Sequence, residues 1–343
     1  MLGNWQWCAP NDWIKIKTID LHTGGEPLRV LIDGLPTIKG STILEKRRFF
    51  RDNLDYIRRG LIFEPRGHAD MYGAVITEAI SDDADFGTFF MHNDGYSTMC
   101  GHAIIALTKL VLDTKMIEKQ EKDPIVVIDA PPGKIVAQAY RSNGVVEKVS
   151  FLNVPSFIVH ENQCVEVEEI GKLNFDIAFG GAYYAYVDTK QLDLSLEPKD
   201  YSKIINYGRL IKSAVMKNYS ITHPYEDDLS FLYGVIFIGD SLSDNHSRNV
   251  CVFADGEVDR SATGSGVSGR AAIHFAKGEI GVNEVISIES ILGTTMTVEV
   301  VEERCYGEYK AIIPRVTGKA HIIGQNEFCF DPKDKLNEGF IFR

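Results

Sequence analysis

The chain has 343 residues, of which 44% are hydrophobic and 24% charged, and a formal net charge of −12 at pH 7. This length is too great for one ordinary hydrophobic core and predicts two domains. The acidic balance, with no basic run to offset it, argues against a nucleic-acid surface but leaves room for a locally positive site.

The N-terminus and the cysteines indicate the compartment. No basic segment followed by an apolar stretch precedes Ile14, and no apolar run is long enough to span a bilayer. We therefore expect a loosely attached tail, no signal peptide and no membrane contact. The six cysteines are scattered, without a C-x-x-C pair or a zinc-type pattern of Cys and His. They predict a cytoplasmic protein with reduced thiols and no metal.

The first half of the chain predicts strands around one buried helix. Residues 14–20 alternate in polarity and the pattern resumes at 28–32 after a glycine-rich turn, which is typical of a hairpin. Charged residues at helical spacing predict an exposed amphipathic helix over 41–59. The stretch 103–107 has almost no polar face and predicts a helix inside a domain. Short strands are expected at 71–79 and 86–92.

The second half repeats this plan. The expected elements are several strands between 125 and 189, a surface helix at 200–217, strands at 231–239 and 249–254, a small-residue helix at 270–276, and a β-rich end at 284–324. A serine-containing turn followed by a small-residue helix thus occurs once in each half. The echo is consistent with a duplicated α/β (α+β) architecture in which each half wraps a sheet around one helix.

The two turns before the small-residue helices predict a site. A helix N-terminus presents unpaired backbone N–H groups and a positive dipole end, which bind a carboxylate and stabilise a thiolate. Cys100 at such a position should be unusually acidic. Gly101 and Gly264 would let the backbone approach a ligand closely. If the two helix starts face each other, Cys100 and Thr263 flank a cage for a small carboxylate, an arrangement suited to removal of an alpha proton.

Less specific interpretations exist for each of these residues. A cysteine beside a glycine is more often structural than catalytic, and the segment 264–266 resembles an ordinary flexible turn. His102 is two residues from Cys100, a spacing that favours opposite faces and a poor Cys–His pair. Asp259 could simply cap the second turn. Structural or surface roles are expected for His22, His68, His92 and His274.

Several motifs resemble segments of the proline racemase family. The two signature segments are Met99-Cys100-Gly101-His102 and Asp259-Arg260-Ser261-Ala262-Thr263-Gly264-Ser265-Gly266. Further similar segments are Asp20-Leu21-His22-Thr23-Gly24-Gly25-Glu26-Pro27, Gly67-His68-Ala69-Asp70-Met71-Tyr72-Gly73 and the closing stretch from Asp331-Pro332 to Gly339-Phe340. The resemblance runs from about residue 14 to the C-terminus, with the motifs in the family's order.

The resemblance implies a fold shared with diaminopimelate epimerase. Two pseudo-symmetric α/β domains each wrap a mixed sheet around a buried helix, and the site lies in the cleft between them. The implied first domain comprises residues 14–158 together with 327–343 and carries Cys100. The implied second domain comprises residues 159–326 and carries Thr263.

One departure from the family pattern bears on function. Racemases of this family use two cysteines, and Thr263 stands in the place of the second. A threonine hydroxyl is too weak an acid and base to replace a thiol. The resemblance is then closest to the family's trans-3-hydroxy-L-proline dehydratases, which carry this cysteine–threonine pair. It implies that a single thiol on one ring face removes the alpha proton and then protonates the departing hydroxyl.

The resemblance also assigns roles to the site residues. Cys100 is the expected base and Thr263 a hydrogen-bond partner of the substrate. The N–H groups of Gly101, His102, Gly264 and Ser265 are expected to hold the carboxylate, Asp259 and His102 to contact the ring nitrogen, and Tyr72 and Phe253 to enclose the ring. No cofactor is implied, the partner is a small imino acid, and a homodimer is expected. A proline or hydroxyproline racemase or epimerase, and a non-catalytic imino-acid-binding protein, remain alternatives.

Overall fold

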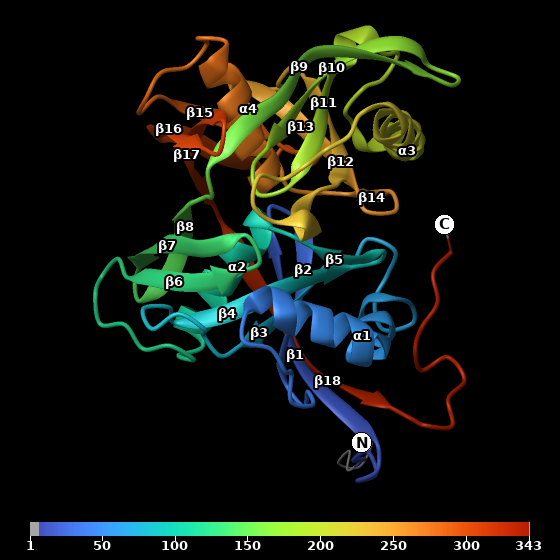
Figure 1. Ribbon diagram of the computed structural model, residues 1–343. Helices are drawn as coiled ribbons and strands as arrows, with labels where there is room; N and C mark the ends of the chain where they lie inside the picture. The colour runs from blue at the N-terminus through green and yellow to red at the C-terminus, as the bar shows by residue number, and fades with distance from the viewer. Residues whose placement is uncertain (1–6, 343) are drawn as a thin grey trace.

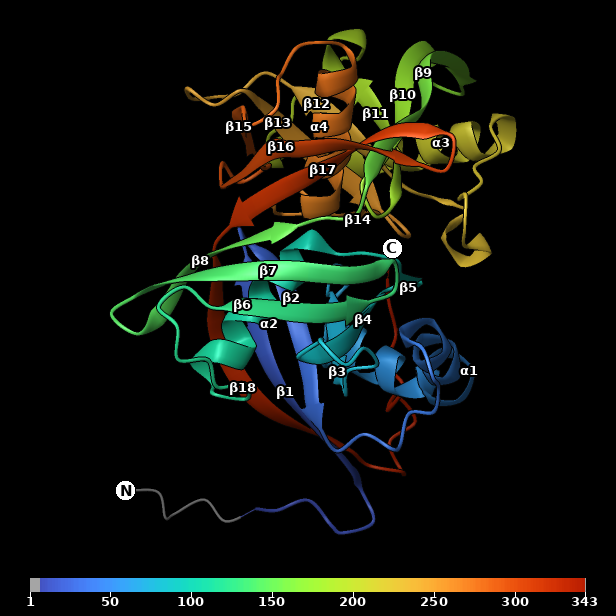
Figure 2. The same cartoon turned by 60° about the vertical axis from the view of Figure 1, so that its left-hand side comes forward.

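The computed structural model describes residues 7–342, which form two lobes (Figure 1). Predictions that fall on residues 1–6 and 343, namely the start of the N-terminal tail and the last residue of the first domain, lie outside the described residues. In Figure 2 residues 7–13, which precede β1, run away from the body of the protein. None of the helices between residues 7 and 342 has both the length and the apolar character needed to cross a bilayer.

The first lobe surrounds α2. Its elements are β1 (Ile14–Thr23), β2 (Glu26–Asp33), α1 (Ile43–Ile62), β3 (Gly73–Thr77), β4 (Phe86–His92), β5 (Gly95–Ser97), α2 (Gly101–Asp113), β6 (Ile125–Ala130), β7 (Gly133–Ser142), β8 (Val145–Leu152) and β18 (Ala320–Phe330). Every residue of α2 from Gly101 to Leu112 is buried, and the helix contacts β1, β7, β8 and β18. A helix without a polar face is stable only when it is enclosed in this way.

Helix α1 covers the outer side of the first lobe (Figure 1). It begins after Thr42, whose side chain accepts a hydrogen bond from the backbone N–H of Glu45, as an N-cap threonine commonly does. Its apolar side, including Phe50 and Ile57, packs against β4. The amphipathic helix predicted over 41–59 is therefore confirmed, with its end three residues later, at Ile62.

The second lobe surrounds α4 in the same manner. Its elements are β9 (Ser156–Val167), β10 (Gly171–Phe179), β11 (Tyr183–Asp188), η1 (Thr189–Gln191), η2 (Pro198–Asp200), α3 (Tyr201–Asn218), η3 (Asp227–Leu229), β12 (Leu232–Gly239), β13 (Ser247–Phe253), β14 (Glu257–Val258), α4 (Gly264–Ala276), β15 (Val285–Glu289), β16 (Thr295–Tyr306) and β17 (Tyr309–Gly318). Helix α4 is buried from Gly264 to Ile273 and contacts β9, β10, β16 and β17.

Strand pairing joins the lobes. The end of β17 pairs with β8, from Arg315 opposite Leu152 to Gly318 opposite Val149, so the hydrogen-bonded sheet continues from one lobe into the other. Strand β18 then pairs with β1 along its whole length, which returns the chain to the first lobe (Figure 2). This pairing places residues 320–326 beside β1. As a statement about independently folding units, the division at 158/159 and 326/327 stays a prediction.

Candidate active site

The two central helices meet end to end. A methyl group added to Gly101, at the start of α2, would lie 2.6 Å from the Cα atom of Gly264, at the start of α4. The first N–H groups of both helices have no intrahelical acceptor, because the repeating bonds begin with Ile104 N–H to Cys100 O and Val267 N–H to Thr263 O. The contact brings two positive helix ends to one place, which favours an anion between or beside them.

Backbone geometry holds Thr263 at the second helix start. Thr263 has a φ of 66°, in the left-handed region that β-branched residues rarely adopt. The turn before it is fixed by the Asp259 carboxylate, which accepts from Ser261 N–H at 2.7 Å, and by the Ser261 hydroxyl, which accepts from Thr263 N–H at 3.1 Å. Such strain is characteristic of functional positions. Asp259 therefore does cap this turn, in addition to lining the site.

A cavity of about 260 Å³ lies at the junction of the helices. Its lining residues are Tyr72, Met99, Cys100, Gly101, His102, Tyr184, Tyr233, Phe253, Asp259, Thr263, Gly264 and Ser265. Every residue predicted for the site is in this set, so the structure brings all of them together, and their roles stay predictions. Sequence reasoning missed Met99, Tyr184 and Tyr233. Within the part of the chain that the structure describes, no group of His, Cys, Asp and Glu side chains is arranged to hold a metal ion.

Cys100 and His102 form a contact that the sequence argument did not favour. The Sγ atom of Cys100 lies 3.1 Å from Nδ1 of His102. The expectation of opposite faces is wrong because Cys100 is the N-cap of α2, with an extended backbone. An N-cap side chain folds back over the first turn and reaches the second and third helical positions. His102 occupies the second helical position of α2.

Burial dominates the acidity of the thiol. Burial raises the pKa of Cys100 well above its usual range. The N–H of Ala103 and the hydroxyl of Tyr72 act in the opposite direction, while the charges of Asp259 and Glu26 raise the pKa further. The expectation of an unusually acidic thiol is therefore wrong for this closed site. The helix N-terminus does favour the thiolate, but desolvation is the larger effect.

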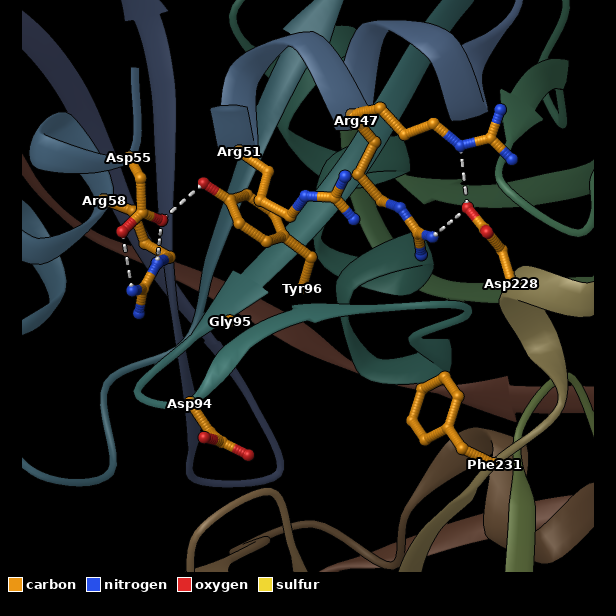
Figure 3. Close-up of a pocket in the computed structure, with 10 residues that line it drawn as sticks. Arg47, Arg51, Asp55, Arg58, Asp94, Gly95, Tyr96, Asp228 and Phe231 are labelled. Atoms are coloured by element: carbon orange, nitrogen blue, oxygen red, sulfur yellow. Dashed lines mark hydrogen bonds and ion pairs between the residues drawn. The ribbon is translucent and has the colours of Figure 1, made fainter. Parts of the chain in front are cut away.

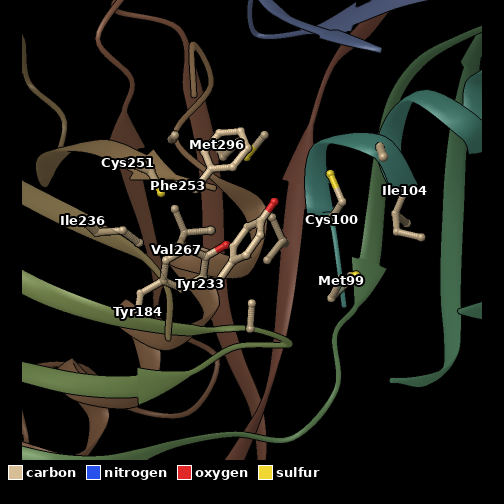
Figure 4. Packing of buried hydrophobic residues seen from close by; sticks show 14 of the residues in the cluster. Met99, Cys100, Ile104, Tyr184, Tyr233, Ile236, Cys251, Phe253, Val267 and Met296 are labelled. Atoms are coloured by element: carbon tan, nitrogen blue, oxygen red, sulfur yellow. The ribbon is translucent and has the colours of Figure 1, made fainter. Parts of the chain in front are cut away.

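Two buried hydroxyls at the site are left without a well-formed hydrogen bond. Among the described residues, neither Thr263 Oγ1 nor Tyr233 Oη has a partner of normal geometry. Both side chains are about 95% buried, since each residue is 5% exposed. Native proteins rarely leave buried polar atoms unsatisfied, so these two hydroxyls are candidates for contacts with a ligand. Figure 4 shows Tyr233 extending from the second lobe toward Cys100, which projects from the start of α2.

Polar contacts hold the lobes closed around the cavity. Glu26 of the first lobe accepts from the backbone N–H of Arg260 at 2.7 Å. The Arg260 guanidinium pairs with Asp70 at 2.7 Å, and the hydroxyl of Tyr201 donates to the same carboxylate. Burial, followed by the charge of Asp259, raises the pKa of Glu26 well above its usual range. Glu26 and Asp70 lie in two of the family-like segments, and that membership was the signal that could have identified them.

A separate pocket beside α1 is lined by arginines. It has a volume of about 930 Å³ and lies where α1 approaches η3 of the second lobe (Figure 3). Arg47 and Arg48 both pair with Asp228, at 3.1 and 2.9 Å, and Arg58 pairs with Asp55. Because these guanidiniums are occupied by carboxylates of the same chain, the pocket is better described as an ion-paired contact between the lobes.

The chain is similar to several known proteins over nearly its whole length. A protein of Colwellia psychrerythraea named trans-3-hydroxy-L-proline dehydratase is 52% identical over 96% of this chain and 94% of its own length. A Xenopus tropicalis protein named trans-L-3-hydroxyproline dehydratase is 39% identical over 97% of each chain. The crystal structure of a hydroxyproline epimerase from Agrobacterium vitis, with bound trans-4-hydroxy-L-proline, superposes with a TM-score of 0.91 at 28% identity and 96% coverage of both chains.

The structural match confirms the expected fold class over nearly the whole chain. The sequence pattern of the proline racemase family matches residues 18–341. This protein belongs to the proline racemase family.

Proposed function

We propose that this chain is a cofactor-independent hydro-lyase that converts trans-3-hydroxy-L-proline to delta-1-pyrroline-2-carboxylate. The observation that carries the proposal is the pairing of one thiol, Cys100, with one alcohol, Thr263, around a single closed cavity. A racemase needs acids and bases of comparable strength on both faces of the alpha carbon, and an alcohol is far weaker than a thiol in both roles. The names of the relatives that are 52% and 39% identical support the same conclusion.

The substrate carboxylate is proposed to bind at the facing helix starts. Gly101 and His102 of α2, with Gly264 and Ser265 of α4, supply N–H groups that have no acceptor within their helices. When the alpha proton leaves, negative charge spreads into the carboxylate, and the same N–H groups and helix dipoles stabilise it. Tyr72 and Phe253, which contact each other edge to face with ring centroids 6.0 Å apart, are proposed to form an aromatic wall against the substrate ring and to exclude water.

One thiol suffices for the elimination. In trans-3-hydroxy-L-proline the hydroxyl lies opposite the carboxylate and hence on the same ring face as the alpha hydrogen. The Cys100 thiolate takes the alpha proton, the electron pair forms the C2–C3 double bond, and the C3–O bond breaks. The thiol then gives this proton to the departing hydroxide, which leaves as water and regenerates the thiolate. The enamine product tautomerises to pyrroline-2-carboxylate.

His102 and Asp259 are proposed to make the thiolate available. Burial lowers the pKa of His102, so the ring is neutral at neutral pH, and the Pro27 carbonyl is a hydrogen-bond partner of the ring. If one ring nitrogen donates to this carbonyl, Nδ1 remains free to accept the thiol proton. The substrate's cationic ring nitrogen, bound beside Asp259, would further stabilise the thiolate, which offsets the effect of burial.

The proposal is tested with the purified protein and trans-3-hydroxy-L-proline. Formation of pyrroline-2-carboxylate without any added cofactor is expected, and Cys100→Ser is expected to abolish it. Thermal unfolding of the variant, together with its binding of pyrrole-2-carboxylate, controls for folding. Absence of product from a folded wild-type protein would reject the proposal. Binding of the imino acid without turnover would then favour a non-catalytic binding protein.

An epimerase is the second candidate, favoured by the close superposition on the Agrobacterium vitis enzyme. It would need a second acid opposite Cys100. Cys251 does not serve, because it has no exposed surface and is not among the residues that line the cavity. Incubation with trans-4-hydroxy-L-proline in deuterium oxide distinguishes the two reactions. Inversion at the alpha carbon supports the epimerase, whereas exchange without inversion supports a single base.

A cytoplasmic location and a homodimer are also part of the proposal. The location rests on cysteines that are all free thiols, including the exposed Cys8, Cys164 and Cys305, as expected in a reducing compartment. The homodimer rests on the prevalence of symmetric dimers among globular enzymes. Light scattering of the purified protein measures its mass against the 38.3 kDa of one chain.

A further inference from the structure

Tyr233 carries a hydroxyl that the scheme above does not use. It lies on β12 in the second lobe, and its side chain lines the cavity. The neighbouring tyrosines commit their hydroxyls elsewhere. Tyr72 Oη lies 2.5 Å from Ser97 Oγ, and Tyr184 Oη lies 2.8 Å from Ser265 Oγ. Across residues 7–342, Tyr233 Oη has no hydrogen bond of normal geometry, and the hydroxyl of Tyr72 is a polar neighbour that influences its pKa.

The ring of Tyr233 is held firmly by other aromatic residues. It stacks on Phe253 with ring centroids 5.4 Å apart and an interplanar angle of 29°. Edge contacts with Tyr184 and His92, at 5.8 and 5.7 Å, fix its orientation. The hydroxyl therefore cannot turn away to find water, and it extends toward Cys100 (Figure 4). A preorganised donor of this kind stabilises charge that develops during a reaction.

The Tyr233 hydroxyl extends toward the side of the cavity that holds Cys100, and this determines which substrate atom it meets. If the proposed dehydration is correct, the 3-hydroxyl shares a ring face with the alpha hydrogen and so faces the thiol. We propose that Tyr233 Oη donates a hydrogen bond to the 3-hydroxyl oxygen of the substrate, and that this bond strengthens as the C3–O bond breaks. Tyr233 would thus be a catalytic residue and the one that selects a substrate hydroxylated at C3.

The tyrosine keeps its proton in this step. Burial, and then the nearby Tyr72 and Glu257, raise the pKa of Tyr233 well above its usual value of 10.0. It is therefore a neutral donor at any physiological pH. The proton that converts the leaving hydroxide to water comes from the Cys100 thiol, which received it from the alpha carbon, so the atoms and charges of the elimination balance without a second acid.

The test compares elimination with alpha-proton exchange in deuterium oxide. For Tyr233→Phe, product formation from trans-3-hydroxy-L-proline should fall about a hundredfold, as for loss of one donor at a developing oxyanion. Removal of the alpha proton does not need Tyr233. The ratio of deuterium uptake at C2 of the unreacted substrate to product formation should therefore be higher for the variant than for the wild type. Affinity for pyrrole-2-carboxylate, which has no 3-hydroxyl, should be unchanged.

Tyr183→Phe is the matched control. Tyr183 is a buried tyrosine on the neighbouring strand β11, its hydroxyl makes a long bond of 3.4 Å to Thr222 O, and it does not line the cavity. This variant should behave as the wild type in all three measurements.

Three results would overturn the inference: near-wild-type elimination by Tyr233→Phe, an equal loss of elimination and exchange, or loss of pyrrole-2-carboxylate binding. The last two would assign Tyr233 to the shape of the cavity alone. A wild-type protein that forms no product would instead reject the dehydratase proposal itself.

Discussion

Gly101 and Gly264 approach so closely that a methyl group on Gly101 would lie 2.6 Å from the Cα atom of Gly264. Neither glycine has the positive φ that disfavours L-residues, so an alanine at either position fits its own backbone. The requirement for glycine comes from the opposite lobe. The absence of two side chains is what lets the helix starts meet and close the cavity.

Gly101→Ala should therefore separate folding from closure. We expect a melting temperature close to that of the wild type and a fall in kcat/KM of at least about a hundredfold, because a displacement near 1 Å in a catalytic site can cost this much. Gly281→Ala is the control, since a methyl group there meets nothing closer than 3.8 Å. Full activity of Gly101→Ala would mean that the catalytic arrangement does not need this contact.

The acidity of Cys100 gives a prediction about pH. Because burial raises its pKa above the usual value of 9.0, the thiol is protonated in the free enzyme at neutral pH. Alkylation of Cys100 by iodoacetamide should accelerate as pH rises through 9, without a plateau at lower pH, since only the thiolate reacts. Peptide mass spectrometry follows Cys100 separately from the exposed Cys164 and Cys305. A plateau near pH 7 would show that the helix N-terminus outweighs burial.

The helix starts and the Cys100–His102 contact show how much of the site could be predicted from the sequence. A helix after each turn follows from local patterns, namely a small-residue run, and the structure has both; the second was expected at 270–276 but begins at Gly264, because residues 264–269 are helical rather than part of the turn. The Cys100–His102 contact depends on the N-cap conformation, which spacing alone does not reveal. The sign of the pKa shift depends on how completely the second lobe covers the thiol. Desolvation is a property of the assembled fold, so no window of sequence contains it.

Functional residues that lie outside the family-like motifs were harder to predict. Tyr233 lies in a strand in which most other residues are apolar or aromatic, and Asp228 lies in the short 3-10 helix η3. Each contacts a residue far away in the sequence: Tyr233 packs on His92, and Asp228 pairs with Arg47, which is 181 positions away. Periodicity predicts which face of a strand is buried but not which buried hydroxyl lacks a partner. By contrast, Glu26 and Asp70 lie in family-like motifs, and both make contacts between the lobes.

Thr263→Cys tests the argument from the missing second thiol. The variant should invert trans-4-hydroxy-L-proline at its alpha carbon, because a thiol opposite Cys100 supplies the second acid and base that the alcohol lacks. Chiral chromatography detects the inverted product. Thr263→Ser is the matched control, since it changes the side chain without adding a thiol, and it should not invert. A Thr263→Cys protein that binds pyrrole-2-carboxylate but does not invert would show that a second thiol is insufficient.

The contact of Arg47 and Arg48 with Asp228 predicts a latch between the lobes (Figure 3). The hydrogen bond from Arg48 lowers the pKa of Asp228, with a further contribution from Arg47, despite partial burial. A carboxyl whose pKa is lowered in the closed state stabilises that state above its ordinary pKa of 3.8, and the stabilisation is lost as pH falls through the lowered value. At neutral pH the latch is therefore fully formed.

Asp228→Asn should weaken this closure without touching the reacting atoms. We expect KM to rise about threefold to tenfold with little change in kcat, as for loss of a partly exposed charged pair, and the difference from wild type should shrink at high salt. Asp52→Asn is the control, because Asp52 pairs with Arg51 on the same exposed helix and bridges no lobes. Steady-state kinetics at two ionic strengths provide the measurement. Equal KM values for Asp228→Asn and wild type would show that the lobes close without help from these ion pairs.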